Sequence, residues 1–196
     1  MPAAIIMDFE QIEGSPTEAY DAVMKDMDLK GILPTGALRH VAGPTEKGLR
    51  VVDVWESMDA FGRFAAERIG PVTAQHGIGE PVTQSWEVVF EAEGDGEPAF
   101  LHVVTLPGVD EEGFNALNDL VRQGGGLPPG LLWHANGAVE AGYRTIGAWV
   151  SRAARDEFIE TKIRPAMEAA GATAQPQFEE LEVHSSMSTV AAATSP

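Results

Sequence analysis

The sequence contains no cysteine and few basic residues for its length. Its 196 residues include 13 Lys and Arg against 30 Asp and Glu, which gives a formal net charge of -17. Without cysteine there are no disulfides and no thiolate metal ligands, and a cytoplasmic location is expected. A surface this acidic repels phosphate backbones, so we expect no nucleic-acid partner.

Long apolar stretches are missing as well. No run approaches the roughly 20 residues that a transmembrane helix needs, and residues 1–8 lack the basic start and the apolar length of a signal peptide. The sequence therefore predicts no membrane partner. Hydrophobic residues make up 44% of the chain, which is enough to predict a packed core.

One pattern of residues occurs twice, 94 positions apart, as from His40 to His134. The first copy contains Leu33, Pro34, Gly36, His40, Gly43, Gly48, Arg50, Trp55 and Ser57. The second contains Leu127, Pro128, Gly130, His134, Gly137, Gly142, Arg144, Trp149 and Ser151. A repeat of this kind predicts two similar structural units.

Each unit has the pattern β-α-β-β-α-β, which is the ferredoxin-like arrangement. In the first unit we expect strands at 4–9, 37–43, 49–56 and 84–91, and helices after the caps Ser15 and Ser57 and from Pro71. In the second we expect strands at 99–106, 131–137, 142–150 and 178–184, and helices after Asp110, at 152–163 and at 165–170. We therefore predict an α+β fold with ferredoxin-like repeats at 1–92 and 99–186, a linker at 93–98 and a disordered tail at 187–196.

A ferredoxin-like sheet carries helices on one face only, so its other face needs a cover. Two units in one chain can cover each other. The sequence therefore predicts an intramolecular pseudo-dimeric α/β barrel, either monomeric or part of a higher homo-oligomer.

The strand faces decide which side chains line the predicted space between the sheets. Pairing Gly43 with Gly48 places His40 opposite Val51 and puts His40, Asp53 and Trp55 on one face. The opposite face carries valines, which suit the helix side, so we expect the His40 face to line the inter-sheet cavity. The same logic places His134, Thr145, Gly147 and Trp149 there in the second unit. Asp8 and His102, matched by the same offset of 94, are expected to join them from the first strands.

Histidine is a candidate base near neutral pH, and tryptophan beside polar groups suits a small-molecule pocket. We expect His134 or His102 to accept a substrate proton and Trp149 to stack on the substrate. The candidate substrate-binding residues are His40, Trp55, Asp8, Asp53 and Thr145. No HxH or HxxxH pair indicates a metal site.

These residue types also have structural interpretations. The histidines at 40 and 134 can bond a backbone group, the tryptophans at 55 and 149 can fill the core, and Arg50 and Arg144 can pair with an acidic neighbour.

Residues 54–61, Val-Trp-Glu-Ser-Met-Asp-Ala-Phe, resemble a motif of the dimeric α/β-barrel superfamily, in its antibiotic-biosynthesis-monooxygenase-like branch. Residues 150–158 resemble it more weakly, so the likeness covers two tandem copies. It implies a cofactor-independent monooxygenase that acts on an aromatic or polyketide-like small-molecule ligand in the inter-sheet cavity. Some relatives degrade haem, but their first-strand amide is replaced here by Asp8 and His102. We therefore expect no cofactor, with haem as the alternative.

Two other function classes stay open at this point. The protein can be a non-catalytic ligand-binding or stress-associated barrel, or an assembly protein that uses its outer surfaces. An open interior pocket lined by His134 and Trp149 would favour an enzyme, whereas a pocket filled by side chains would favour the binding protein.

Overall fold

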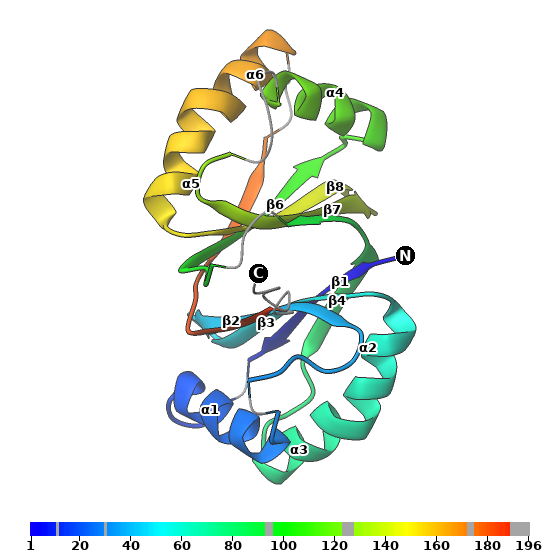
Figure 1. Cartoon of the computed structure of the whole chain (residues 1–196), viewed down its shortest axis with the longest axis vertical. Helices are drawn as coiled ribbons and strands as arrows, with labels where there is room; N and C mark the ends of the chain where they lie inside the picture. The colour runs from blue at the N-terminus through cyan, green and yellow to red at the C-terminus, as the bar shows by residue number, and fades with distance from the viewer. Residues whose placement is uncertain (11, 30, 93–95, 123–127, 172–174, 189–196) are drawn as a thin grey trace, which may run out of the picture. The chain divides into compact units, whose positions relative to one another are not determined.

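A computed structural model describes residues 1–10, 12–29, 31–92, 96–122, 128–171 and 175–188 (Figure 1). The chain divides into two compact units. Unit 1 comprises Met1–Glu87 and the segment that begins at Leu181, and unit 2 comprises Val88–Glu180. Each unit contains a five-stranded sheet with helices on one face, which confirms the predicted α+β class.

The sheet of unit 1 has the strand order β10-β2-β3-β1-β4. Its strands are β1 (Ala3–Phe9), β2 (Ala37–Thr45), β3 (Gly48–Trp55), β4 (Val82–Glu87) and β10 (Ser185–Ser188). Its helices are α1 (Pro16–Met27) and a continuous path formed by α2 (Met58–Phe64), the π-helix η1 (Ala65–Ile69) and α3 (Gly70–Gln75). Ser15 and Ser57 cap α1 and α2 through their hydroxyls, as the sequence predicts.

The sheet of unit 2 has the corresponding order, β5-β7-β8-β6-β9. Its strands are β5 (Val89–Ala92), β6 (Phe100–Pro107), β7 (Leu131–Val139), β8 (Gly142–Trp149) and β9 (Gln177–Glu182). Its helices are α4 (Glu111–Val121), capped by Asp110, and a path formed by α5 (Arg152–Phe158), the π-helix η2 (Ile159–Ile163) and α6 (Arg164–Ala169). Over the described residues, no helix combines the length and the apolar character that crossing a membrane requires.

The last strand predicted for repeat 1 is in fact two strands, whereas the one predicted for repeat 2 at 178–184 is β9, and the additional strand β10 follows it. Trp86, Val88 and Phe90 alternate like one strand, but pairing stops at Val88, so β4 belongs to the first sheet and β5 to the second. In the same way β9 joins the second sheet and β10 the first. The unit boundaries therefore lie at Glu87 and Glu180, before the predicted ends of the repeats.

Part of the predicted linker, 93–95, and most of the predicted tail, 189–196, lie outside the described residues, whereas residues 187 and 188 belong to β10. The closure of the two units into one pseudo-dimeric barrel stays a prediction.

The hairpin of unit 1 is tighter than predicted. Thr45 pairs with Gly48 and His40 pairs with Asp53, which is a shift of two residues from the predicted partner Val51. The first of the two predicted strands ended at Gly43, but Pro44 and Thr45 also pair within the strands. Because the shift is even, it leaves the residues that share a face unchanged.

The predicted orientation of that face was wrong. Trp55 and Val51 belong to one apolar cluster with Tyr20 of α1 and Phe61 of α2, so this face of the sheet packs against the helices of its own unit. His40 also lies on this side, since its ring contacts Tyr20. The prediction failed because the central strands carry apolar residues on both faces, so valines alone did not identify the helix side.

Candidate functional site

A pocket of about 600 Å³ lies in unit 2. From the strands its lining includes His102, His134, Thr145, Gly147 and Trp149. From the helices it includes residues of α4, α5, η2 and α6, among them the rings of Phe114 and Phe158. The pocket therefore lies between the sheet and the helices of unit 2, on the face opposite to the one predicted to hold the cavity.

Strand pairing places three of these residues in one row. Gly147 on the central strand β8 pairs with His102 on one side and with His134 on the other. Gly147 has no side chain, and a Cβ at this position would lie 2.5 Å from His102 Nε2 and 2.8 Å from Trp149 Nε1. The structure thus brings together His102, His134, Thr145 and Trp149, all of which the sequence singles out.

His102 is a buried and electrically neutral member of the row. Only 7% of the residue is exposed, and its Nδ1 has no hydrogen-bond partner within the part of the chain that the structure describes. Burial and the nearby positive charge of Arg155 lower the pKa of His102 from 6.5 to about 3, against an opposing effect of Glu180. A neutral imidazole of this kind can form hydrogen bonds but is a weak base.

Trp149 lies beside His102 with its ring at an angle of 72° and a centroid distance of 5.8 Å. Its indole Nε1–H is buried and has no acceptor among the described residues. Phe158 packs against the other part of the ring, with the centroids 5.4 Å apart. Trp149 is therefore a packed core residue whose one polar atom is left without a partner.

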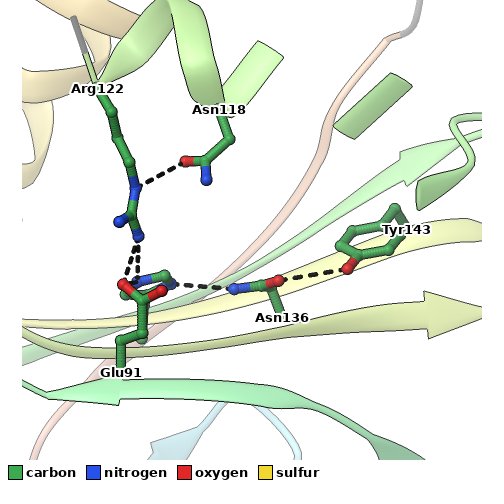
Figure 2. A network of polar contacts seen from close by, with 6 residues as sticks. Glu91, Asn118, Arg122, Asn136 and Tyr143 are labelled. Carbon is green, nitrogen blue, oxygen red and sulfur yellow. Dashed lines mark hydrogen bonds and ion pairs between the residues drawn. The ribbon is translucent and has the colours of Figure 1, made fainter. Parts of the chain in front are cut away.

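A chain of polar contacts surrounds His134 (Figure 2). Tyr143 donates its hydroxyl proton to Asn136 Oδ1 at 3.3 Å, and Asn136 Nδ2 donates to His134 Nδ1 at 3.2 Å. His134 Nε2–H then donates to Glu91 Oε2 at 3.0 Å. The orientation of Asn136 thus leaves Nδ1 as the unprotonated nitrogen of His134.

Arg122 completes this network at the end of α4. Its guanidinium donates to Glu91, and its Nε donates to Asn118 at 3.3 Å. Burial raises the pKa of Glu91, but the hydrogen bonds from Arg122 and His134 outweigh that effect and hold the pKa below its usual value. Glu91 is therefore a charged carboxylate that accepts a hydrogen bond from His134. Sequence reasoning missed Glu91 and Arg122 because neither belongs to the repeated pattern.

The corresponding region of unit 1 is almost closed. Its pocket measures about 70 Å³ and is lined by Tyr20, His40, Asp53 and Trp55 together with apolar residues. His40 Nδ1–H donates to Asp53 Oδ1 at 2.8 Å, and Tyr20 donates its hydroxyl proton to His40 Nε2 at 2.7 Å. Trp55 Nε1–H donates to the other carboxylate oxygen of Asp53 at 3.3 Å. Each polar group of this cluster has a partner.

The phenol of Tyr20 is held in its neutral form in this cluster. Burial raises the pKa of Tyr20 to about 12.

Asp8 does not lie with the other predicted residues. It forms a two-point ion pair with Arg50, at 2.6 and 2.9 Å, and it is absent from the described lining of both pockets. Arg50 thus pairs with an acidic neighbour, as the structural interpretation holds. In unit 2 Arg144 donates instead to the hydroxyl of Thr105, at 2.9 Å.

The predicted equivalence of Asp8 and His102 was wrong. Strand pairing matches His102 with Gly147 and Ile5 with Asp53, so the counterpart of His102 is Ile5. His102 follows Ile5 by 97 positions, whereas Gly147 follows Asp53 by 94. The segment between the first strand and the first helix is three residues longer in unit 1, so a constant offset misaligns the first strands.

Within the described residues no group of three or more potential ligands is arranged to hold a metal ion. The prediction that no cofactor is used stays a prediction.

No family model and no curated protein matches the sequence. Among solved structures, a "putative monooxygenase" from Lactobacillus acidophilus NCFM is similar with a TM-score of 0.73 and 13% identity, over 96% of both chains. Another "putative monooxygenase", from Fusobacterium nucleatum subsp. nucleatum, has a TM-score of 0.71 and 14% identity, over 95% of this chain and 94% of that one. A "putative chlorite dismutase" has a TM-score of 0.60 and 10% identity, over 94% and 95%. At these identities the likeness shows the fold, and the chain shares the ferredoxin-like α/β fold of these proteins.

Proposed function

We propose that the protein is a monooxygenase-like enzyme that oxidises an aromatic or polyketide-like molecule in the pocket of unit 2. The observation that carries the proposal is the open pocket of about 600 Å³ lined by His102, His134 and Trp149. Its volume is in the range of small-molecule sites, and its walls are mainly apolar with a few convergent polar groups. Solved structures with the same fold that are described as "putative monooxygenase" support this choice.

The proposed reaction uses molecular oxygen as the oxidant and needs no other redox partner. A phenol loses its proton, and the resulting electron-rich anion reduces O₂. One oxygen atom becomes the second carbonyl oxygen of a quinone, and the other leaves as water with the two hydrogens that the phenol loses. Atoms and electrons therefore balance with one phenol and one O₂ consumed.

His134 is the better proton acceptor of the two histidines. Its Nδ1 is unprotonated and accepts from the amide of Asn136, while Nε2 donates to Glu91 on the other side. A proton accepted at Nδ1 would form an imidazolium that the Glu91 carboxylate stabilises. His102, whose pKa lies near 3, is suited to hydrogen bonding instead.

Trp149 supplies the apolar surface at the floor of the pocket. Its ring is fixed by Phe158 and His102, so an aromatic substrate meets a wall that is already ordered. Thr145 lines the same pocket and offers a hydroxyl for a polar substituent.

Ligand binding without turnover is the second candidate function, and one observation favours it. Both ring nitrogens of His134 have hydrogen-bond partners, and His102 is a weak base, so the resting pocket presents no free strong base. A binding protein would need nothing further.

Oxygen consumption with a panel of phenols and anthrones tests the proposal. With ¹⁸O₂ the product of a true monooxygenase gains one labelled oxygen atom by mass spectrometry. We expect His134→Gln to lower kcat by about 100-fold or more, the usual effect of losing a general base. Trp133→Phe is the control, because Trp133 is buried on the same strand but is absent from the described lining of the pocket. Equal kcat in His134→Gln and the unmodified protein would contradict the assigned role. Saturable binding without oxygen uptake would favour the second function.

A further inference from the structure

One register position differs between the two units in a way that suggests what the pocket binds. Asp53 in unit 1 and Gly147 in unit 2 each pair with the histidine of the neighbouring strand, His40 and His134 respectively. Each also stands two residues before a buried tryptophan. The surroundings are thus alike, and unit 2 lacks the carboxylate.

In unit 1 that carboxylate satisfies two donors. Asp53 accepts from His40 Nδ1 at 2.8 Å and from Trp55 Nε1 at 3.3 Å. In unit 2 the equivalent indole donor, Nε1 of Trp149, has no partner among the described residues. A buried donor without an acceptor is uncommon and costs free energy, so its presence in a pocket indicates a missing acceptor.

A second nitrogen converges on the same place. A Cβ built on Gly147 would lie 2.5 Å from His102 Nε2 and 2.8 Å from Trp149 Nε1. The two nitrogens are therefore at most about 5.3 Å apart, the sum of those distances. One oxygen atom at a usual hydrogen-bond length of about 2.9 Å can contact both. Both residues are more than nine-tenths buried, and Nε1 of Trp149 is a buried donor without a partner among the described residues.

We propose that the pocket of unit 2 binds its ligand through a carboxylate group that lies over Gly147, where unit 1 holds the carboxylate of Asp53. The ligand then supplies the acceptor that the chain omits. Trp149 Nε1–H and His102 Nε2–H donate to it, as an indole and an imidazole do to Asp53 in unit 1.

The charges around the pocket suit an anion despite the acidic surface. Arg122 and Lys162 line it together with the acidic residue Glu157, and the positive charge of Arg155 acts on His102 from α5. Glu91 and Glu180 are each bound to arginine, which reduces their repulsion of a bound carboxylate. The inference rests on the pocket of the proposed function as a binding site, but it concerns binding and needs no turnover.

Ligand-observed ¹⁹F NMR at neutral pH tests the proposal with 4-fluorobenzoate and its neutral analogue 4-fluorobenzamide. We expect the benzoate to bind at least about tenfold more tightly, which is the factor that 1.4 kcal/mol produces. Trp149→Phe keeps an aromatic ring and removes the donor, so it should reduce this preference to about threefold or less. Trp133→Phe is the matched control and should keep the full preference.

Gly147→Asp provides the reverse test, because it restores the carboxylate to the chain. We expect this variant to lose benzoate binding. Circular dichroism checks that the variant is folded. If it does not fold, the Trp149→Phe comparison decides alone. Equal affinities for benzoate and benzamide, or an unchanged preference in Trp149→Phe, would overturn the proposal.

The two proposals fail separately. Benzoate binding is measured without a substrate or oxygen, so its absence leaves phenol oxidation to be judged by oxygen uptake. Benzoate binding with no oxygen uptake on any phenol would instead refute the oxygenase and leave the carboxylate site in place.

Discussion

Mild acid is expected to destabilise the folded protein through His102. The folded state keeps this imidazole neutral, since burial and the charge of Arg155 lower its pKa from 6.5 to about 3. In the unfolded chain the same histidine has its ordinary pKa of 6.5 and takes up a proton when the pH falls below it. The unfolded state then binds more protons than the folded state, so the free energy of unfolding decreases as the pH falls.

The size of the effect follows from the two pKa values. At pH values between these two pKa values, the free energy of unfolding decreases by up to about 1.4 kcal/mol for each pH unit. From pH 7 to pH 5.5 it amounts to about 1.3 kcal/mol, because the unfolded histidine is already partly protonated at pH 7. Above pH 7 the contribution of His102 to the free energy of unfolding is nearly constant. Below pH 3 no further loss of stability is expected from His102.

Urea unfolding at pH 7 and at pH 5.5 measures the loss of unfolding free energy. The variant His102→Ile isolates the part of this loss that is due to His102. Isoleucine is a suitable replacement because Ile5 occupies the same register position in unit 1. We expect the variant to lose about 1.3 kcal/mol less than the unmodified protein between pH 7 and pH 5.5. His76→Gln serves as the control, since it removes a partly exposed histidine bound to Asp26. Equal losses in His102→Ile and the unmodified protein would refute a buried neutral His102. An NMR titration of its ring protons would report the protonation state of His102 directly.

Three further substitutions test the local structure by chemical or thermal unfolding. Ser151→Ala removes the cap of α5 and should cost about 1 kcal/mol. Gly142→Ala should cost about 2 kcal/mol, because φ is 145° there and the new Cβ would lie 2.2 Å from the carbonyl oxygen of Leu106; an unchanged stability would contradict the strained turn. Asp53→Ala leaves His40 without its carboxylate and should cost about 3 kcal/mol; a loss below about 1 kcal/mol would mean that the buried cluster contributes little.

Local sequence signals predicted most of the elements. Ser15, Ser57, Asp110 and Ser151 accept hydrogen bonds from backbone amides at the starts of their helices. Each cap bonds an amide only three residues away, so the local sequence is sufficient to predict it. Gly77 and Gly171, with φ of 68° and 62°, end the helical paths for the same local reason.

Long-range features were harder to predict from the same residues. The β2–β3 register depended on whether Gly43 or Thr45 pairs with Gly48, and both choices satisfy the strand pattern. The helix side of the sheet depended on which apolar face meets α1, which strand alternation does not specify. The division of the last strand at Val88 depended on pairing partners more than forty positions away, such as Asn136 for Val89.

The sequence singled out some members of the candidate site but not their arrangement. His134 and Trp149 were found because they belong to the repeat, and His102 was found beside the wrong counterpart. Glu91 and Arg122 act through side chains that meet only after folding, from β5 and the end of α4. No spacing in the sequence connects them, so pattern analysis had no signal to use.

The pocket of unit 2 depends on two differences from unit 1 that work only together. Gly147 in place of an aspartate leaves room for the ring of His102, and His102 in place of Ile5 brings a polar atom close to Gly147. A glycine with an isoleucine beside it would leave the indole donor of Trp149 facing an apolar wall. If an aspartate stood in place of Gly147 beside His102, its Cβ would lie 2.5 Å from His102 Nε2. One of the two side chains would then have to move. Because each change is unfavourable without the other, we expect the effects of substituting Gly147 and His102 to be non-additive.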